Sequence, residues 1–317
     1  MNTRAQIRML PDGRRVHMQD GPIDLIVEAF GDSAQVAAAY RAAATRFETV
    51  LDELCRELTF LRQPARVDGP LPEGRVARRM VEAVRPYAAT RFITPMAAVA
   101  GAVAEEILGA MTAAAEICRA YVNDGGDIAL HLTAGETFVI GMVERPGGPA
   151  DPTFRNARNV GHPWFGNSLF GTTTIDFEQP IRGIATSGWR GRSFSLGIAD
   201  AVTILADSAA SADAAATIIA NAVDLPGHPA IGRERACELA PDTDLGERLV
   251  TRSVGQLSAD EISCALAAGA RDAEELYAAG LIRAAALNLQ GKIRIAGVAI
   301  DSQSSEMLST TGSLVHA

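Results

Sequence analysis

Three short segments of the chain carry glycines, hydroxyls and acids at spacings that suit a phosphate or a metal ion. The first is "NDGGDIAL", residues 123–130. Gly125 and Gly126 can expose backbone N–H groups that cradle a phosphate, and Asp124 or Asp127 could orient a metal or a hydroxyl. Taken alone, the same letters are also typical of a helix that ends on a glycine cap.

The second segment is "GIATSGWRGRSFSLGIAD", residues 183–200. Thr186, Ser187, Gly188 and Arg190 place two hydroxyls, a flexible turn and a bidentate phosphate donor within five residues. No serine here is indicated as a nucleophile, because no histidine is close and the GxSxG pattern is absent. The alternative is a plain strand–turn–strand whose tryptophan packs on the surface.

The third segment is "SADAAATIIANAV", residues 211–223. Asp213 and Thr217 are four apart, so both oxygens point from one face of a helix. A carboxylate and a hydroxyl near a helix N-terminus can share a hard cation, while the backbone dipole attracts an anion. The alternative is an ordinary first-turn acid, favoured by the same dipole.

Charge and composition exclude several kinds of protein. The formal net charge is −9, with a pI near 5.1, which argues against a nucleic-acid binder that relies on many cations. Lys292 is the only lysine, so a GxxxxGK[ST] phosphate loop is ruled out and Schiff-base chemistry is confined to that position. The four cysteines and five histidines show no zinc-ligand spacing.

Localisation is predicted from what the chain lacks. The N-terminus has no apolar run behind its arginines, so we expect no signal peptide. The longest apolar candidate, Pro95–Met111, is interrupted by Glu105 and Glu106, which argues against a spanning helix. We therefore expect a cytoplasmic protein without membrane contact.

Hydrophobic periodicity and turn residues predict an α+β fold with an antiparallel sheet, because strand pairs come as hairpins with helices between them. The predicted elements are extended segments over 5–30 with a turn at 11–13, helices over 33–61, 75–86, 94–122 and 208–223, strands over 127–132 and 137–143, extended runs at 171–178, 181–186 and 193–206, mostly loop and helix over 225–290, and a strand within 291–300. Residues 145–170 read as a functional loop, a lid or a disordered insert. We expect one domain over 1–302 and a polar tail over 303–317.

In this order, the segments resemble a known family. The blocks "RRVHMQDGPIDLIVEAFG", "FITPMAAVAGAVAEEIL", "VNDGGDIALHL", "GIATSGWRGRSFSLGIADAVTILA" and "SADAAATIIANAV" are similar to those of a cytoplasmic branch of the ApbE-like proteins. The match to that branch covers most of the chain. Resemblance to the flavin-transferring ApbE enzymes is more distant and lies mainly between residues 94 and 223.

The resemblance implies antiparallel sheets backed by helices, in a T-fold-related arrangement, and Mg²⁺-dependent cleavage of FAD with transfer of FMN to a protein threonine. By analogy, Asp213 and Thr217 match metal ligands, and Val103 matches a position that offers its backbone carbonyl to the metal. The turn of Gly125, Gly126 and Asp127 matches the family's strand-entry glycines. Thr186, Ser187 and Gly188 match its signature turn beside the flavin. Arg190 follows that turn and is the bidentate phosphate donor described above.

Two departures from the family pattern bear on activity. The family has a Lys or Glu where this chain has Ala100, before Gly101. Its histidine-containing segment is cut here to "SFSLGIAD", with Ser195 as the nearest equivalent. A flavin contact and a helper of the transfer chemistry are thus absent from their usual positions.

Two functional hypotheses follow. In the first, an enzyme binds FAD or a related nucleotide with Mg²⁺ and cleaves or transfers its phosphoryl-linked part, with a protein as possible acceptor. In the second, a non-catalytic carrier holds a flavin or pterin-like ring. Alanine-rich helix faces allow close packing, so a homodimer is compatible with both hypotheses.

Overall fold

The structure is a computed structural model that describes residues 4–143, 169–297 and 314–316. The loop predicted over 145–170 and most of the predicted tail therefore lie outside the described residues. The chain divides into two compact units. The first unit comprises Met1–Thr137, Ile175–Ile184 and Ala206–Ala214, and the second comprises Phe138–Thr174, Ala185–Leu205 and Ala215–Ala317. The single domain expected over 1–302 stays a prediction.

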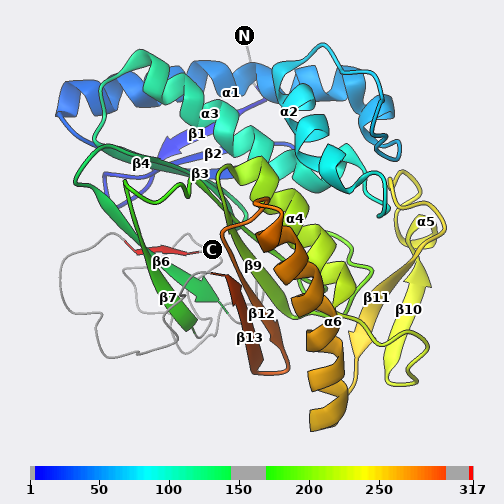
Figure 1. Cartoon of the computed structure of the whole chain (residues 1–317). Coiled ribbons are helices and arrows are strands. Elements are labelled where there is room, and N and C mark those ends of the chain that lie inside the picture. The colour runs from blue at the N-terminus through cyan, green and yellow to red at the C-terminus, as the bar shows by residue number, and fades with distance from the viewer. Residues whose placement is uncertain (1–3, 144–168, 298–313, 317) are drawn as a thin grey trace. The chain divides into compact units, whose positions relative to one another are not determined.

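An antiparallel sheet forms the base of the first unit. Its strands pair in chain order, and the beginning of a further strand, β8, adds beside β5 through Ile128–Ile184 and Ala129–Gly183. The strands are β1 (Gln6–Met9), β2 (Val16–Asp20), β3 (Ile23–Phe30), β4 (Arg119–Asp124), β5 (Asp127–Leu132) and β8 (Gly183–Ser187). The helices are α1 (Ser33–Leu61), α2 (Arg75–Val84), the short η1 (Arg85–Tyr87) and η2 (Pro95–Ala98), and α3 (Val99–Ala114). Figure 1 shows α1, α2 and α3 on one side of these strands.

The helices of the first unit begin and pack as their sequences indicate. Asp32 caps α1 by accepting hydrogen bonds from the backbone of Ala34 and Gln35. The apolar face of α1 buries Phe47 completely. Helix α3 packs on α1 and β5, and Met111 is fully buried there.

The helix predicted over 94–122 is wrong in its second half. Helix α3 ends at Ala114, and residues 119–124 form β4, a central strand between β3 and β5. Apart from Arg119, every β4 residue is buried, and a strand buried on both faces lacks the alternation that marks strands in sequence. The "NDGG" letters consequently make a hairpin turn, with φ of 66° at Gly125 and 116° at Gly126, rather than a helix end.

The second unit combines antiparallel strands with two helices. Strand β9 (Ala201–Ala206) pairs with β12 (Ala284–Leu289), which pairs with β13 (Lys292–Gly297). Helix α6 (Ala259–Ala278) begins with a capping box made by Ser258 and Glu261. Helix α4 (Ala209–Ala222) starts in the first unit and continues into the second.

The remaining strands form a hairpin and a small separate sheet. The hairpin β10 (Ile231–Arg235) and β11 (Leu249–Val254) flanks the short α5 (Ala236–Leu239). Strands β6 (Thr137–Val143) and β7 (Leu169–Asp176) form a small sheet in which β14 (Leu314–His316) runs parallel to β6. The predicted loop-and-helix content of 225–290 missed β10, β11 and β12, and the extended run predicted from 193 becomes a strand only at 201.

The predicted fold class is confirmed, since β1–β2, β2–β3, β3–β4, β4–β5, β5–β8, β9–β12, β12–β13 and β10–β11 all pair antiparallel and helices accompany the sheets. One segment, Pro95–Ala114, is 20 residues long with a mean hydropathy of 1.4, enough by length and composition to cross a membrane. Half of it is buried inside the protein, and core helices of this kind pass the same test. The predicted absence of membrane contact stays a prediction.

Candidate functional site

The N-terminal ends of α3 and α4 touch within the first unit, and we call this contact the α3–α4 junction. A Cβ on Gly101 would lie 2.3 Å from the carbonyl oxygen of Ala209 and 2.7 Å from the nitrogen of Ala210. Only glycine permits this approach, because real Cβ atoms do not come closer than about 3 Å to backbone. The glycine after Ala100 thus has a packing reason that is independent of any ligand.

Two carboxylates stabilise the junction, because each helix contributes one that accepts a backbone N–H group of the other helix. Asp213 of α4 accepts the backbone N–H of Gly101 at 3.0 Å, in the first turn of α3. Glu105 of α3 accepts the backbone N–H of Ala210 at 2.8 Å, in the first turn of α4. Each helix therefore satisfies an N–H group that the other would leave without a partner, and each carboxylate meets the positive end of a helix dipole.

The two carboxylates differ in their electrostatic surroundings. Glu105 is paired with Arg79, whose Nε lies 2.8 Å from it. Asp213 forms no ion pair with any Arg, Lys or His in the part of the chain that the structure describes. Removal from water is the largest cause that raises the pKa of Asp213, and the nearby Asp124 carboxylate adds to it, against the lowering effect of the Gly101 and Ala100 N–H groups; together these effects bring the pKa to about 7.

The β4–β5 turn supplies the second acid of this region. Asp124 is buried, with 4% of its surface exposed. Asn123 accepts the backbone N–H of Gly126 at 2.8 Å, so this N–H is engaged inside the turn. Asp127 begins the next strand, where it pairs with Asp124 across the turn, and it is partly exposed. Of the two acids that the sequence offered, Asp124 is the one whose charge acts on Asp213.

In the second unit, the predicted phosphate turn is organised around a buried acid. Asp200 accepts hydrogen bonds from Arg190 Nε at 2.7 Å, from Trp189 Nε1 at 3.1 Å and from the backbone N–H of Gln290 at 2.6 Å. A Cβ on Gly188 would lie 2.4 Å from the Asp200 carbonyl oxygen, which explains the glycine. Sequence reasoning missed Asp200, although an acid inside the apolar run "GIADAVTILA" is a signal for such a role.

The hydroxyls of this turn have different environments. Thr186 lies at the end of β8, and its Oγ1 is 2.9 Å from Oγ1 of the buried Thr203 on β9. Ser187 follows on the same strand and is partly exposed. Ser195, the residue in place of the family histidine, is buried and accepts the backbone N–H of Gly197 at 3.2 Å, so its role here is to hold the chain.

The remaining predicted metal residues lie on the two helices. Val103 is in α3 with its side chain buried, two residues beyond Gly101. Thr217 lies one turn beyond Asp213 on α4 and is partly exposed. Val103 and Asp213 belong to the first unit, and Thr217 and Arg190 to the second. The grouping of these residues into one site stays a prediction.

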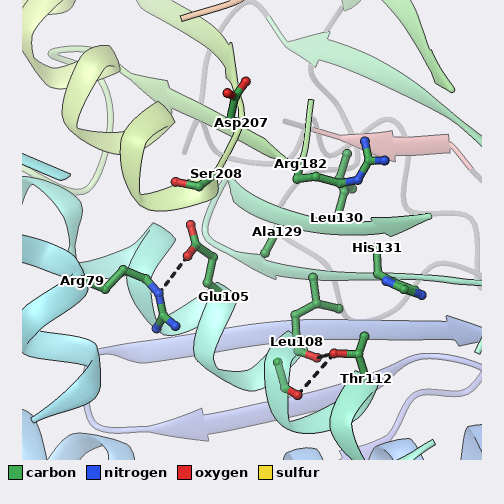
Figure 2. Close-up of a pocket in the computed structure, with 11 residues that line it drawn as sticks. Arg79, Glu105, Leu108, Thr112, Ala129, Leu130, His131, Arg182, Asp207 and Ser208 are labelled. Atoms are coloured by element: carbon green, nitrogen blue, oxygen red, sulfur yellow. Dashed lines mark hydrogen bonds and ion pairs between the residues drawn. The ribbon is translucent and has the colours of Figure 1, made fainter. Parts of the chain in front are cut away.

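A cavity of about 250 Å³ adjoins the α3–α4 junction within the first unit. Figure 2 shows Glu105 and Arg79 on one side, Asp207 and Ser208 above, and Arg182 and His131 opposite. Arg182 is held by the carbonyl oxygens of Phe177, Gln179 and Ile181. Neither the cavity nor these lining residues were singled out by sequence reasoning.

The donor chemistry of Asp213 fits a magnesium ion. Its residue is partly buried, its carboxylate lies near a second acid and it has only neutral N–H partners, so a cation would relieve its cost of ionisation. Among the described residues, no group of three or more His, Cys, Asp or Glu side chains is arranged to hold a metal. A bound Mg²⁺ would therefore rely on one or two carboxylates and complete its shell with water and ligand oxygens, as this ion commonly does.

Comparison with known proteins identifies the class. A family model described as "AbpE bacteria" matches residues 7–295. The chain is 31% identical over 219 residues to a UPF0280 protein of Methanopyrus kandleri, covering 68% of this chain and 74% of that protein. It is also 31% identical over 206 residues to a UPF0280 protein of Methanosarcina acetivorans, covering 63% and 70%. The chain therefore belongs to the AbpE bacteria family, and the family resemblance of its sequence blocks is confirmed.

A search of solved structures finds the apo form of the flavinyl transferase ApbE of Pseudomonas stutzeri. The match covers 92% of this chain and 93% of that one, at 11% sequence identity and a TM-score of 0.40. A likeness of this degree carries no argument about the function of the present chain.

Proposed function

We propose that this protein binds FAD or a related flavin nucleotide together with Mg²⁺, and cleaves or transfers its phosphoryl-linked part. The flavin in this proposal comes from the resemblance of the sequence blocks to ApbE-like proteins, and family membership supports it. The metal in this proposal also comes from that resemblance, and one structural observation supports it. The Asp213 carboxylate is partly buried, lies near Asp124 and has no cationic partner among the described residues.

In this proposal some residues hold the metal and others place the ligand. Asp213 would hold Mg²⁺, with Thr217 and the Val103 carbonyl as the further ligands that the resemblance implies. Mg²⁺ would offset the charge that develops on the pyrophosphate as it is cleaved. Thr186, Ser187, Gly188 and Arg190 would place the ligand, and the turn of Gly125, Gly126 and Asp127 would face its phosphates.

The reaction requires no redox partner. An oxygen nucleophile forms a bond to the phosphorus of the FMN half, the bond to the bridging oxygen breaks, and AMP leaves. Water as nucleophile yields free FMN, and a protein threonine yields covalently bound FMN. We assign no catalytic nucleophile or base, because Ala100 and Ser195 stand where the family has its Lys or Glu and its histidine.

The carrier hypothesis is the second candidate, and the same two departures favour it. A carrier would keep the ligand-placing turn but release no AMP. Its need for a metal would be small, which is why the unneutralised Asp213 favours the enzyme.

One incubation separates the two candidates. Purified protein is mixed with FAD and Mg²⁺, and AMP, FMN and covalent flavin are followed by chromatography and mass spectrometry. The enzyme proposal predicts AMP release that stops when EDTA removes the metal. FAD binding without AMP release would support the carrier, and no flavin binding at all would contradict a flavin ligand in both candidates.

A further inference from the structure

The second unit holds a carboxylate with an unusual set of partners. Asp200 is 6% exposed and joins a turn to a distant strand end. Its own N–H donates to the carbonyl oxygen of Asn288 at 3.0 Å, and its carboxylate accepts the N–H of Gln290 at 2.6 Å. The acid is thereby fixed to the end of β12, a rigid element, before it contacts the turn.

The anchor itself is a strained residue. Gln290 has a φ of 48°, the only positive φ of a non-glycine residue in the described part of the chain. A residue with a Cβ adopts this conformation only where its surroundings hold it. Its side chain bonds to Gly255 and Leu257, so both its backbone and its amide are fixed.

From this anchor, Asp200 orders an aromatic residue and a cation. It accepts hydrogen bonds from Trp189 Nε1 and from Arg190 Nε. The Arg190 guanidinium lies over the Trp189 ring, with its central carbon 4.3 Å from the ring centre. Arg190 is exposed, and its two terminal nitrogens bond to no other group among the described residues.

We propose that Asp200 is a positioning residue, which holds Trp189 and Arg190 as a stacked pair that receives the aromatic ring and phosphate of the ligand. An aromatic ring packs well on a flat indole–guanidinium pair, and the free terminal nitrogens suit a phosphate oxygen. The ligand-binding part of this inference rests on the proposed flavin nucleotide. The positioning part does not.

Tryptophan fluorescence tests the two parts separately. The chain has two tryptophans, Trp164 and Trp189, so the Trp164→Phe variant leaves Trp189 as its only indole reporter. In that background we expect FAD to quench the emission of Trp189. Asp200→Asn should shift that emission, increase its quenching by acrylamide and weaken FAD binding about tenfold, since a charge-assisted contact is lost.

A double-mutant cycle shows whether Asp200 acts through Arg190. Arg190→Gln alone should also weaken FAD binding about tenfold, and the double variant should be no weaker than either single one. Arg192→Gln removes the same charge from the same turn and should leave affinity unchanged. Arg190 is exposed, so Arg190→Gln keeps the test valid even if an Asp200 variant fails to fold.

Each contrary result overturns a particular part of this proposal. Unchanged Trp189 emission in Asp200→Asn overturns the positioning role, whatever the ligand is. Additive losses in the cycle overturn the positioning of Arg190 by Asp200. FAD binding without quenching of Trp189 overturns the ligand-binding part and leaves the proposed function standing. Absence of FAD binding by the parent protein contradicts the proposed function and the ligand-binding part together.

Discussion

The α3–α4 junction and the turn that carries Trp189 and Arg190 each contain a central aspartate, Asp213 in the first and Asp200 in the second, and the two carboxylates are neutralised differently. Asp200 has an arginine, an indole N–H and a backbone N–H as partners. Asp213 has backbone N–H groups and a neighbouring acid. An arginine therefore pairs with the carboxylate in one place, and the carboxylate lacks a cationic partner among the described residues in the other. That difference is why we propose the metal at the junction and ligand placement at the turn.

The largest expected effect tests whether the junction needs its close helix contact. Gly101→Ala should destabilise the protein by about 3 kcal/mol, because its Cβ would overlap backbone atoms that cannot move aside. Gly109→Ala is the matched control on the same helix, since nothing lies within 4 Å of its added Cβ. We expect the control to be neutral or slightly stabilising. Urea unfolding of the two variants checks this, and equal stabilities would refute the close contact.

A smaller effect is expected where the carboxylate is already neutralised. Asp200→Asn should cost about 2 kcal/mol, because Arg190 and the Gln290 N–H lose a charged acceptor. Chemical denaturation of the variant and the parent measures it. A variant as stable as the parent would show that Asp200 contributes no net stability.

The smallest effect changes with pH and concerns Asp213. Its folded pKa is raised from 3.8 to about 7, so in this range the folded state binds the proton more tightly than the unfolded state. Stability from this group is present below pH 4 and is lost as pH rises towards 7. Asp213→Asn keeps an acceptor for the Gly101 N–H but cannot ionise. We therefore expect its thermal midpoint, relative to the parent, to rise by a few degrees between pH 5 and pH 8. A constant difference would mean that Asp213 has an ordinary pKa.

The fold class follows from hairpin patterns and from the clear helical periodicity of α1. The sequence predicts helix where β4 lies, because burial on both faces removes the alternation that marks a strand. The sequence also misses strand β12, "AAALNL", for the same reason and because its alanines favour helix by intrinsic propensity. Pairing with distant strands decided both cases, and pairing is invisible in a single short window.

The candidate site was predictable in its residues but not in their contacts. Asp213 and Gly101 are 112 positions apart, and only the fold shows that one caps the helix of the other. Asp200 was overlooked because its partners include a backbone N–H 90 residues away. The cavity beside Arg79 and Arg182 likewise has walls from separate parts of the chain, so no local pattern marks it.

Calorimetry of FAD binding, with and without Mg²⁺, tests most directly the claim that Asp213 demands a cation. The parent protein should bind FAD at least tenfold more tightly with Mg²⁺ than with EDTA. Asp213→Asn should bind FAD with one affinity under both conditions while keeping its fold. If the parent and Asp213→Asn show the same response to Mg²⁺, Asp213 is a helix cap and the metal assignment is wrong.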